Sequence, residues 1–182
     1  MEITKTFYPQ TRDKWRTWLE KNHTNHKEIW LVYYSKKSGK PRVEYNDAVE
    51  EALCYGWIDS TMKKIDEHCF AQRFTPRKPA SAWSELNKER ARRMIKNKKM
   101  THAGLALLPP GLLKEKFEVP ADILKVLKKD KETWKNFEQF PESYKRIRMG
   151  FIHNSRNRPE FFKKRLDYFL KMTKQNKMYG SR

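Results

Sequence analysis

The amino-acid sequence predicts an α+β fold, in which a small antiparallel sheet packs with helices and is followed by a C-terminal helical bundle segment. Three strand-like runs, rich in β-branched and aromatic residues or alternating in polarity, all lie in the first half of the chain, at 29–34, 57–65 and 70–75. The second half instead repeats apolar residues every three or four positions, which is the spacing of one helix face. Strands followed by helices indicate a sheet-containing module with a helical segment after it.

The length and the aromatic content allow one good core, or a core of about 100 residues with a smaller appendage. The chain has 182 residues, of which 37% are hydrophobic, a low fraction for a globular protein. Its 6 Trp, 8 Tyr and 10 Phe offset this low fraction. Each aromatic side chain can bury roughly 150–250 Å², so we expect a core rich in aromatic rings.

The first predicted helix covers residues 11–22, with Thr11 as its N-cap. Its apolar residues fall at positions i, i+3 and i+4 and share one face: Trp15, Trp18 and Leu19. A buried strand is predicted at 29–34, and the lysine-rich, glycine-containing loop at 36–41 ends it.

The second predicted helix is capped by Asn46 or Asp47 and ends at Cys54. Gly56 lies just past its end, where a glycine commonly stops a helix because it adopts positive φ without strain.

An antiparallel pair of strands is predicted at 57–65 and 70–75, turning near 66–68. Asp59 and Arg73 are placed to meet across this pair, where opposite charges stabilise a sheet by roughly 0.2–1 kcal/mol. An ion pair within the sheet is therefore the plain structural explanation for both side chains.

A third helix is predicted from a Ser81 cap to about residue 97, after the proline-flanked run 76–79 ends the last strand. A short helix at 101–108 follows, and the Pro-Pro-Gly run at 109–111 breaks the periodicity. We divide the chain on this basis into an α+β module at 1–108, a linker at 109–120 and a basic helical segment at 121–182.

The net charge of +19 exceeds the roughly 2–8 units that keep a small domain in solution. An anionic partner is the functional explanation, and a lysine-rich codon bias is the alternative. The excess is concentrated in the second half, because residues 1–84 carry a net +4, residues 85–108 a net +5 and residues 109–182 a net +10.

The sequence contains neither a signal-peptide pattern nor an apolar run long enough for a membrane span, so we expect a cytoplasmic protein. Its two cysteines, Cys54 and Cys69, are expected to remain thiols. No glycine-rich phosphate loop and no paired Cys or His spacing occurs, so we expect no cofactor and assign no metal ligands.

A dense group of aromatic and polar residues between positions 57 and 87 forms the candidate ligand site. In this hypothesis Arg73 and Arg77 bind a carboxylate or phosphate as a fork while Asp59 orients the ligand. The full candidate set, with tryptophan as a stacking wall, is Trp57, Asp59, Arg73, Arg77, Trp83, Ser84 and Asn87. Ser81 and Ser84 lie where a helix begins, so capping is their first role, and no catalytic residue is assigned.

A second candidate surface binds polyanions rather than small ligands. Six basic residues of the third helix and its end could follow a phosphate backbone: Arg90, Arg92, Arg93, Lys96, Lys98 and Lys99. The alternative for this run is an ordinary solvated helix face.

The blocks ALCYGWIDS, QRFTPRKP and SAWSELN resemble the hallmark blocks of the YdeI/OmpD-associated family, also labelled bacteriocin-protection proteins. The tail VPADILKVLKKDKETWKNFEQFPESYKRIRMGFI is similar to the helical C-terminal segment of that family. The chain departs from the family pattern at 154–160, where family members usually carry a segment like AK..ETR.KRI. The resemblance implies a stress or bacteriocin-protection role and no agreed reaction.

Three hypotheses follow for the function. The chain is a binding protein for an anionic partner such as nucleic acid, an enzyme or receptor for a small anionic ligand at the Trp57–Asn87 cluster, or a protection factor acting through another interaction. We favour binding over catalysis, because no complete set of acid, base and nucleophile can be assembled.

Overall fold

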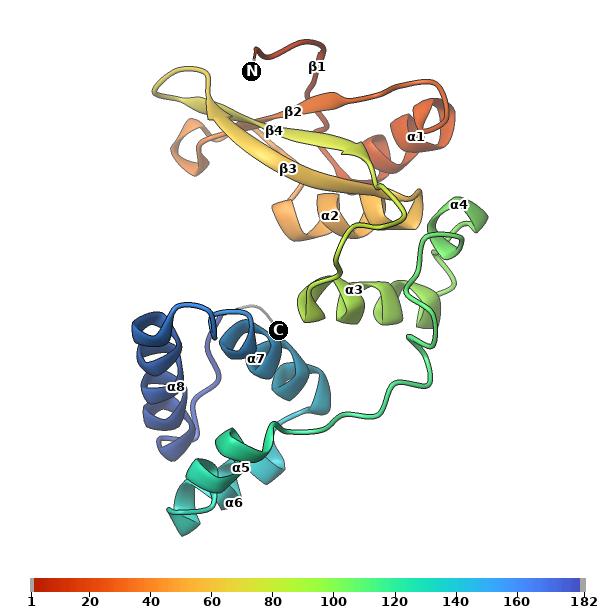
Figure 1. Ribbon diagram of the computed structural model, residues 1–182. Coiled ribbons are helices and arrows are strands. Elements are labelled where there is room, and N and C mark those ends of the chain that lie inside the picture. The colour runs from red at the N-terminus through yellow and green to blue at the C-terminus, as the bar shows by residue number, and fades with distance from the viewer. Residues whose placement is uncertain (1, 181–182) are drawn as a thin grey trace. The chain divides into compact units, whose positions relative to one another are not determined.

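The computed structural model describes residues 2–180, which form two compact units (Figure 1). The N-terminal unit comprises residues 1–82 and 91–110, and the C-terminal unit comprises residues 83–90 and 111–182. The first contains a sheet with helices and the second is helical, so the predicted α+β class is confirmed. The division into 1–108, 109–120 and 121–182 stays a prediction.

The sheet of the N-terminal unit has four strands in the order β1-β2-β4-β3. Strands β2 (Ile29–Tyr34), β4 (Cys69–Pro76) and β3 (Trp57–Lys64) pair antiparallel, as predicted from the sequence. Strand β1 (Thr6–Phe7) adds a parallel pair at the β2 edge and makes the sheet mixed. A strand of two residues is too short to show an alternation of polar and apolar side chains, so the sequence pattern did not indicate β1.

Helices α1 (Arg12–Asn22) and α2 (Tyr45–Cys54) pack against each other, and α2 also contacts β3 (Figure 1). Thr11 caps α1 as predicted, because its hydroxyl accepts a hydrogen bond from the Lys14 amide at 3.2 Å. Trp15 is fully buried, and its indole Nε1 donates to the Ala48 carbonyl at 2.9 Å. One aromatic side chain thus fills the core and joins α1 to α2.

The predicted cap of α2 is wrong. The helix begins at Tyr45 with Glu44 as N-cap, and Glu44 makes no side-chain capping bond. Asp47 instead lies in the first turn, where its carboxylate binds Arg12 at 2.8 Å and is therefore occupied by an ion pair. The C-terminal prediction is confirmed, because Gly56 has φ +73° and its amide donates to the Leu53 carbonyl.

Helix α3 (Glu85–Lys96) is capped by Ser84 and not by Ser81. The Ser84 hydroxyl accepts from the Asn87 amide at 3.2 Å, whereas the Ser81 carbonyl accepts from the Arg77 side chain. The contact with Arg77 keeps this stretch out of the helix, so α3 is capped three residues later than the sequence predicted. Beyond α3 come a tight turn and the short helix α4 (His102–Leu105), with Thr101 as its N-cap.

The C-terminal unit contains four helices in its described part, as the apolar spacing predicted: α5 (Ala121–Leu127), α6 (Lys131–Gln139), α7 (Glu142–His153) and α8 (Pro159–Lys174). Their buried core is made of Ile123, Leu127, Phe137, Phe140, Tyr144, Met149, Ile152 and Phe169. The Asn136 amide of α6 donates to the carbonyls of Thr173 and Lys174 at 3.1 Å each. It thereby adds hydrogen bonds to carbonyls at the end of α8, where the Thr173 carbonyl also accepts from the Asn176 amide at 2.9 Å.

At Gly104 the backbone of α4 lies close to the backbone at the end of α2. A substitution there tests how closely the two helices pack. A Cβ at this position would overlap the Cys54 carbonyl oxygen and come within 2.6 Å of the Leu53 carbonyl oxygen. We expect Gly104→Ala to lower the free energy of unfolding by about 1–3 kcal/mol, the usual cost of overpacking, in urea titrations followed by tryptophan fluorescence.

Gly111→Ala is the control, because its Cβ would meet nothing within 4 Å and only the φ of +74° opposes it. An unchanged free energy of unfolding for Gly104→Ala would contradict the close approach of α4 to α2.

Candidate functional site

The residues of the predicted ligand site fall into both units. Trp57, Asp59, Arg73 and Arg77 belong to the N-terminal unit, and Trp83, Ser84 and Asn87 belong to the C-terminal unit. Their role as one ligand site stays a prediction, and the contacts of each are described in its own unit.

The expected ion pair between Asp59 and Arg73 is wrong. The β3–β4 register places Asp59 opposite Phe74, and an irregularity between Asp59 and Met62 shifts the pairing beyond it. The Asp59 carboxylate accepts a hydrogen bond from the Tyr45 hydroxyl at 2.6 Å. Arg73 lies opposite Trp30 of β2, and its Nε donates to the Glu28 carboxylate at 2.7 Å.

Arg77 and Trp57 have structural partners. Arg77 is 6% exposed, and its guanidinium donates to the carbonyls of Ser81 at 3.2 Å and Ala82 at 2.6 Å. Burial lowers the pKa of Arg77. Trp57 is 1% exposed and donates from Nε1 to the His23 carbonyl at 3.0 Å. Both side chains thus hold the loops around the sheet.

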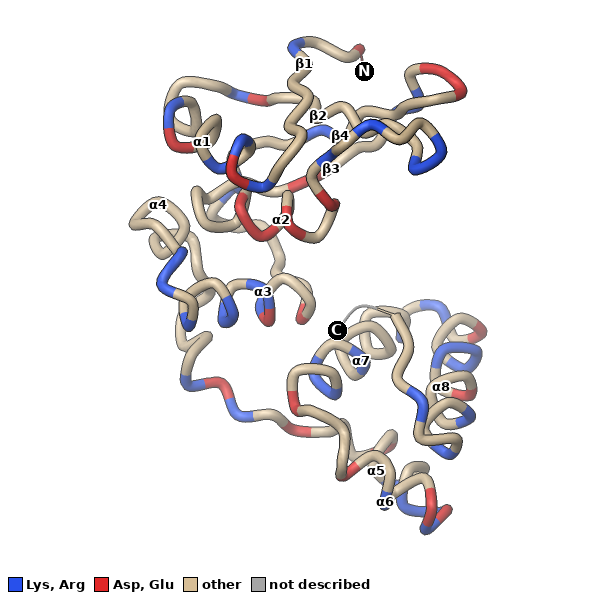
Figure 2. Tube along the Cα trace, turned by 180° about the vertical axis from the view of Figure 1, so that it is seen from behind, with Lys and Arg blue, Asp and Glu red and all other residues tan. Residues whose placement is uncertain are grey.

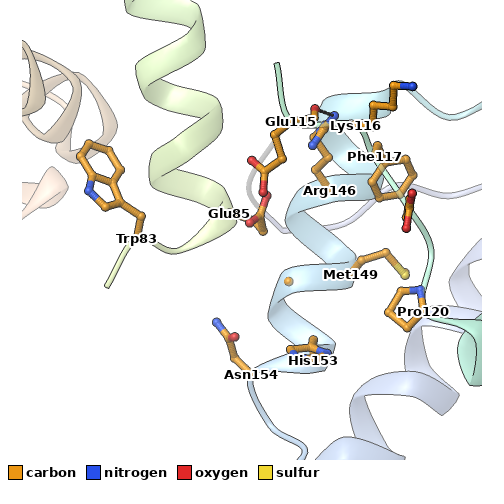
Figure 3. Close-up of a pocket in the computed structure, with 12 residues that line it drawn as sticks. Trp83, Glu85, Glu115, Lys116, Phe117, Pro120, Arg146, Met149, His153 and Asn154 are labelled. Atoms are coloured by element: carbon orange, nitrogen blue, oxygen red, sulfur yellow. Dashed lines mark hydrogen bonds between the residues drawn. The ribbon is translucent and has the colours of Figure 1, made fainter. Parts of the chain in front are cut away.

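Trp83 lines a cavity of about 210 Å³ in the C-terminal unit (Figure 3). Lys88 joins two carboxylates of this cavity, with Nζ at 2.7 Å from Glu85 and 2.8 Å from Glu115. Burial opposes the charge on Lys88, but its hydrogen bonds to the two glutamates prevail and raise its pKa. On the α7 side, Arg146 is 8% exposed and donates to the Glu115 carbonyl at 2.8 Å.

The cavity lies where α7 crosses the first turn of α3. Gly150 of α7 makes this crossing possible, because a Cβ there would overlap the Glu85 side chain. Arg146 also lies 2.8 Å from the Glu142 carboxylate. The acidic and basic side chains around the cavity bind one another, and Arg146 of α7 also lies 3.8 Å from the Glu89 carboxylate of α3.

The six residues of the predicted polyanion surface have different environments. Arg90 is 4% exposed and donates to the Asn87 side chain at 2.9 Å, and Arg93 binds the Glu50 carboxylate of α2 through Nε at 2.9 Å. Arg92 is half-buried, whereas Lys96, Lys98 and Lys99 are exposed. The three lysines lie at the C-terminal end of α3, where the helix dipole favours cations.

Sequence reasoning missed a network of ion pairs in the N-terminal unit. Arg12 binds Asp47 at 2.8 Å, Glu50 at 3.0 Å and Glu51 at 2.5 Å. Arg16 binds the other Glu51 oxygen at 2.6 Å. Glu50 is 5% exposed and Glu51 is fully buried, so the arginines supply the charges these carboxylates need. Figure 2 shows the acidic positions gathered along α2.

Sequence reasoning also missed a surface of the C-terminal unit that we call the α8 face: Phe151, Arg158, Phe161, Lys164, Arg165 and Tyr168. The rings of Phe151, Phe161 and Tyr168 are 42%, 51% and 49% exposed. The guanidinium carbon of Arg165 lies 3.7 Å from the centre of the Phe151 ring, and that of Arg158 lies 4.8 Å from the centre of the Phe161 ring. Figure 2 shows basic positions along the whole of α8.

One signal in the sequence could have revealed the α8 face. Phe161 and Tyr168 are seven residues apart and so share a side of the helix, one position before Phe162 and Phe169, which face the core. The two aromatic pairs are offset by one residue and so lie on different sides of the helix. Both sides cannot face the core, so one pair must face solvent.

Within residues 2–180 the structure brings together no three His, Cys, Asp or Glu side chains that could hold a metal ion. No helix in the same range is long and apolar enough to cross a membrane.

Comparison with family models shows which known protein families the chain resembles. Residues 7–107 match a domain of unknown function (DUF8412), and residues 116–176 match the model described as Bacteriocin-protection, YdeI or OmpD-Associated. The chain belongs to the DUF8412 family, whose model covers more than half of it, and its residues 116–176 are similar to the second family. Comparisons with curated proteins and with solved structures find no match.

The expected relationship to YdeI/OmpD-associated proteins is thus confirmed, and its location is now defined. The match covers α5 to α8, whereas the three blocks between positions 51 and 87 lie in the DUF8412 range. The departure noted at 154–160 falls in the connection between α7 and α8, next to Phe151 and Arg158 of the α8 face.

Arginine substitutions should show that the ion-pair network contributes more to the free energy of unfolding than Arg73 of the predicted ligand site does. Arg12→Ala removes the cation that the two buried carboxylates share and leaves each with one arginine, so we expect a loss of about 3 kcal/mol in the free energy of unfolding. Arg73→Ala breaks one partly exposed pair with Glu28 and should cost about 1 kcal/mol or less. Urea titration of both variants measures the difference. A larger loss for Arg73→Ala would contradict the assignment of the network as the main electrostatic support.

Cys54 should be unreactive in the folded protein. It is fully buried, and burial raises the pKa of its thiol to about 11, so very little thiolate exists at pH 8. In a Cys69→Ser variant, which leaves Cys54 as the one thiol, we expect no reaction with a disulfide reagent until urea unfolds the chain. Rapid labelling of the folded variant would show that the α2–α4 contact opens readily.

Proposed function

We propose that this protein binds nucleic acid through the α8 face. The observation that carries the proposal is the alternation of exposed aromatic rings with cationic side chains on α8 and the end of α7. The cationic side chains would attract the phosphates of a nucleic acid, and its bases would stack on the aromatic rings. This combination is found in proteins that bind nucleic acid without strong sequence preference.

The distribution of charge around α8 supports this choice of surface. With 100° between successive residues, Phe161, Lys164, Arg165, Tyr168 and Lys171 fall on one flank of the helix. The acidic residues of α8, Glu160 and Asp167, fall next to this flank toward the other side of the helix. A polyanion lying along the flank would therefore meet cations without an intervening carboxylate.

The N-terminal unit has a separate basic stretch at the C-terminal end of α3. No Asp or Glu occurs between Glu89 and Glu115, and Lys96, Lys98 and Lys99 are exposed in that stretch. Arg90 and Arg93 are already bound within their units and would contribute less. The proposed compartment is the cytoplasm, and the protection role in the family description would depend on this binding.

The alternative is a receptor or enzyme for a small anionic ligand at the Trp57–Asn87 cluster. It has less support, because Asp59, Arg73 and Arg77 bind Tyr45, Glu28 and backbone carbonyls of their own unit. A ligand would have to displace these partners, and each displacement opposes binding.

A salt titration with charge variants tests the proposal. Affinity for a fluorescent oligonucleotide should fall steeply with salt, because each phosphate contact releases counterions. We expect Lys164→Ser/Lys171→Ser to weaken binding and to reduce the slope of log affinity against log salt by about 1.4 for a single strand. Fluorescence anisotropy between 50 and 200 mM salt, roughly the range over which such contacts respond, measures both.

The matched control removes two charges from the same unit. Lys129→Ser/Lys131→Ser changes two exposed lysines at the α5–α6 connection that are not part of the α8 face, and should leave the slope nearly unchanged. If both double variants weaken binding equally, net charge and not the α8 face attracts the oligonucleotide. If the unchanged chain binds none at physiological salt, the proposal is wrong.

A further inference from the structure

We infer that the α8 face takes single-stranded nucleic acid, with unpaired bases stacked on Phe161 and Tyr168. This inference rests on the proposed function and goes further, because it names the form of the ligand and the side chains that distinguish it from a duplex. The argument uses the exposure of the rings, their spacing and the positions of the neighbouring guanidinium groups.

The two rings are not required by the core of the C-terminal unit. Phe169 fills that core at 0% exposure and Phe162 packs against it, while Phe161 and Tyr168 leave about half of their surface in solvent. Leaving aromatic surface in water forgoes the stabilisation that burial would give. A flat partner that covers the rings would recover it.

The spacing of the rings suits successive bases. Seven residues of α-helix advance about 10.5 Å, and a stacked strand advances about 3.4 Å per nucleotide. The rings of Phe161 and Tyr168 are therefore about three nucleotides apart along a strand that follows the axis of α8. Tyr168 is further held by an edge contact to Tyr179, with ring centres 4.8 Å apart.

Guanidinium groups stand beside the rings and are already oriented. Arg165 lies over the Phe151 ring and donates from Nη1 to the Phe151 carbonyl at 2.8 Å, while Arg158 lies over the Phe161 ring. A guanidinium held flat against an aromatic ring keeps its outer N–H groups directed along the surface. There they would meet the phosphates on either side of a stacked base.

A duplex does not fit this surface as well. Its bases are stacked on one another inside the helix, so their faces cannot reach Phe161 or Tyr168 unless the strands separate. A membrane is also a poorer partner, because an interfacial helix needs a continuous apolar face, and that face of α8 is used by the core. The remaining rings are separated by Lys164 and Arg165.

The test compares single-stranded and duplex oligonucleotides of equal length in the full chain. Phe161→Leu/Tyr168→Leu removes the rings and keeps apolar side chains, so charge and salt slope should not change. We expect the affinity for single strands to fall tenfold or more, since stacking accounts for about 1–3 kcal/mol per base. Duplex affinity should stay within about twofold. Tyr45→Leu, at an exposed ring of the N-terminal unit, is the control and should change neither affinity.

Phe161→Trp provides an independent measurement with a larger stacking surface, and it should raise single-strand affinity. The inference is overturned if the leucine variant keeps its single-strand affinity, or if the unchanged chain prefers duplex. The proposed function still holds in both cases, provided that the lysine variant loses binding. Binding to anionic phospholipid vesicles without binding to either oligonucleotide would overturn the inference and the proposed function together.

Discussion

The ion pairs between α1 and α2 are the constraint on which the N-terminal unit depends. Glu50 and Glu51 are buried on α2, and burial of two carboxylates is tolerated because Arg12, Arg16 and Arg93 surround them. These contacts fix α1 on α2 while Trp15 fills the space between the helices and the sheet. They also occupy arginines that would otherwise add to the basic surface. The number of arginines, and not the net charge, therefore overstates the basic surface of this unit.

Much of the fold could be predicted from periodicity. The strand at 29–34, the antiparallel pair after Trp57 and the helical C-terminal segment follow from local patterns that tertiary packing reinforces. One error arose where a side chain found a partner distant in sequence, because Asp47 binds Arg12 instead of capping α2. The other error is local. Arg77 holds the Ser81 carbonyl four residues along the chain, and the cap of α3 moves to Ser84.

The candidate sites were harder to predict for a related reason. Asp59 and Arg73 were expected to meet across β3 and β4, but Asp59 lies opposite Phe74, one residue away from Arg73, and each side chain has a different partner. The α8 face was absent from the sequence reasoning because Phe161, Phe162, Tyr168 and Phe169 all suit a core at helical spacing. Only the packed unit shows which pair of rings is buried and which stays in solvent.

The division of helix α3 between the two units affects where the chain can be cut into fragments. Its first turn, through Arg90, groups with the C-terminal unit, and its remainder from Ala91 groups with the N-terminal unit. A fragment that starts in the stretch after Pro110 would therefore lack Glu85 and Lys88, and with them the helix turn on which Gly150 packs. Neither family match by itself marks where the protein can be cut, because residues of one continuous helix belong to each of the two units.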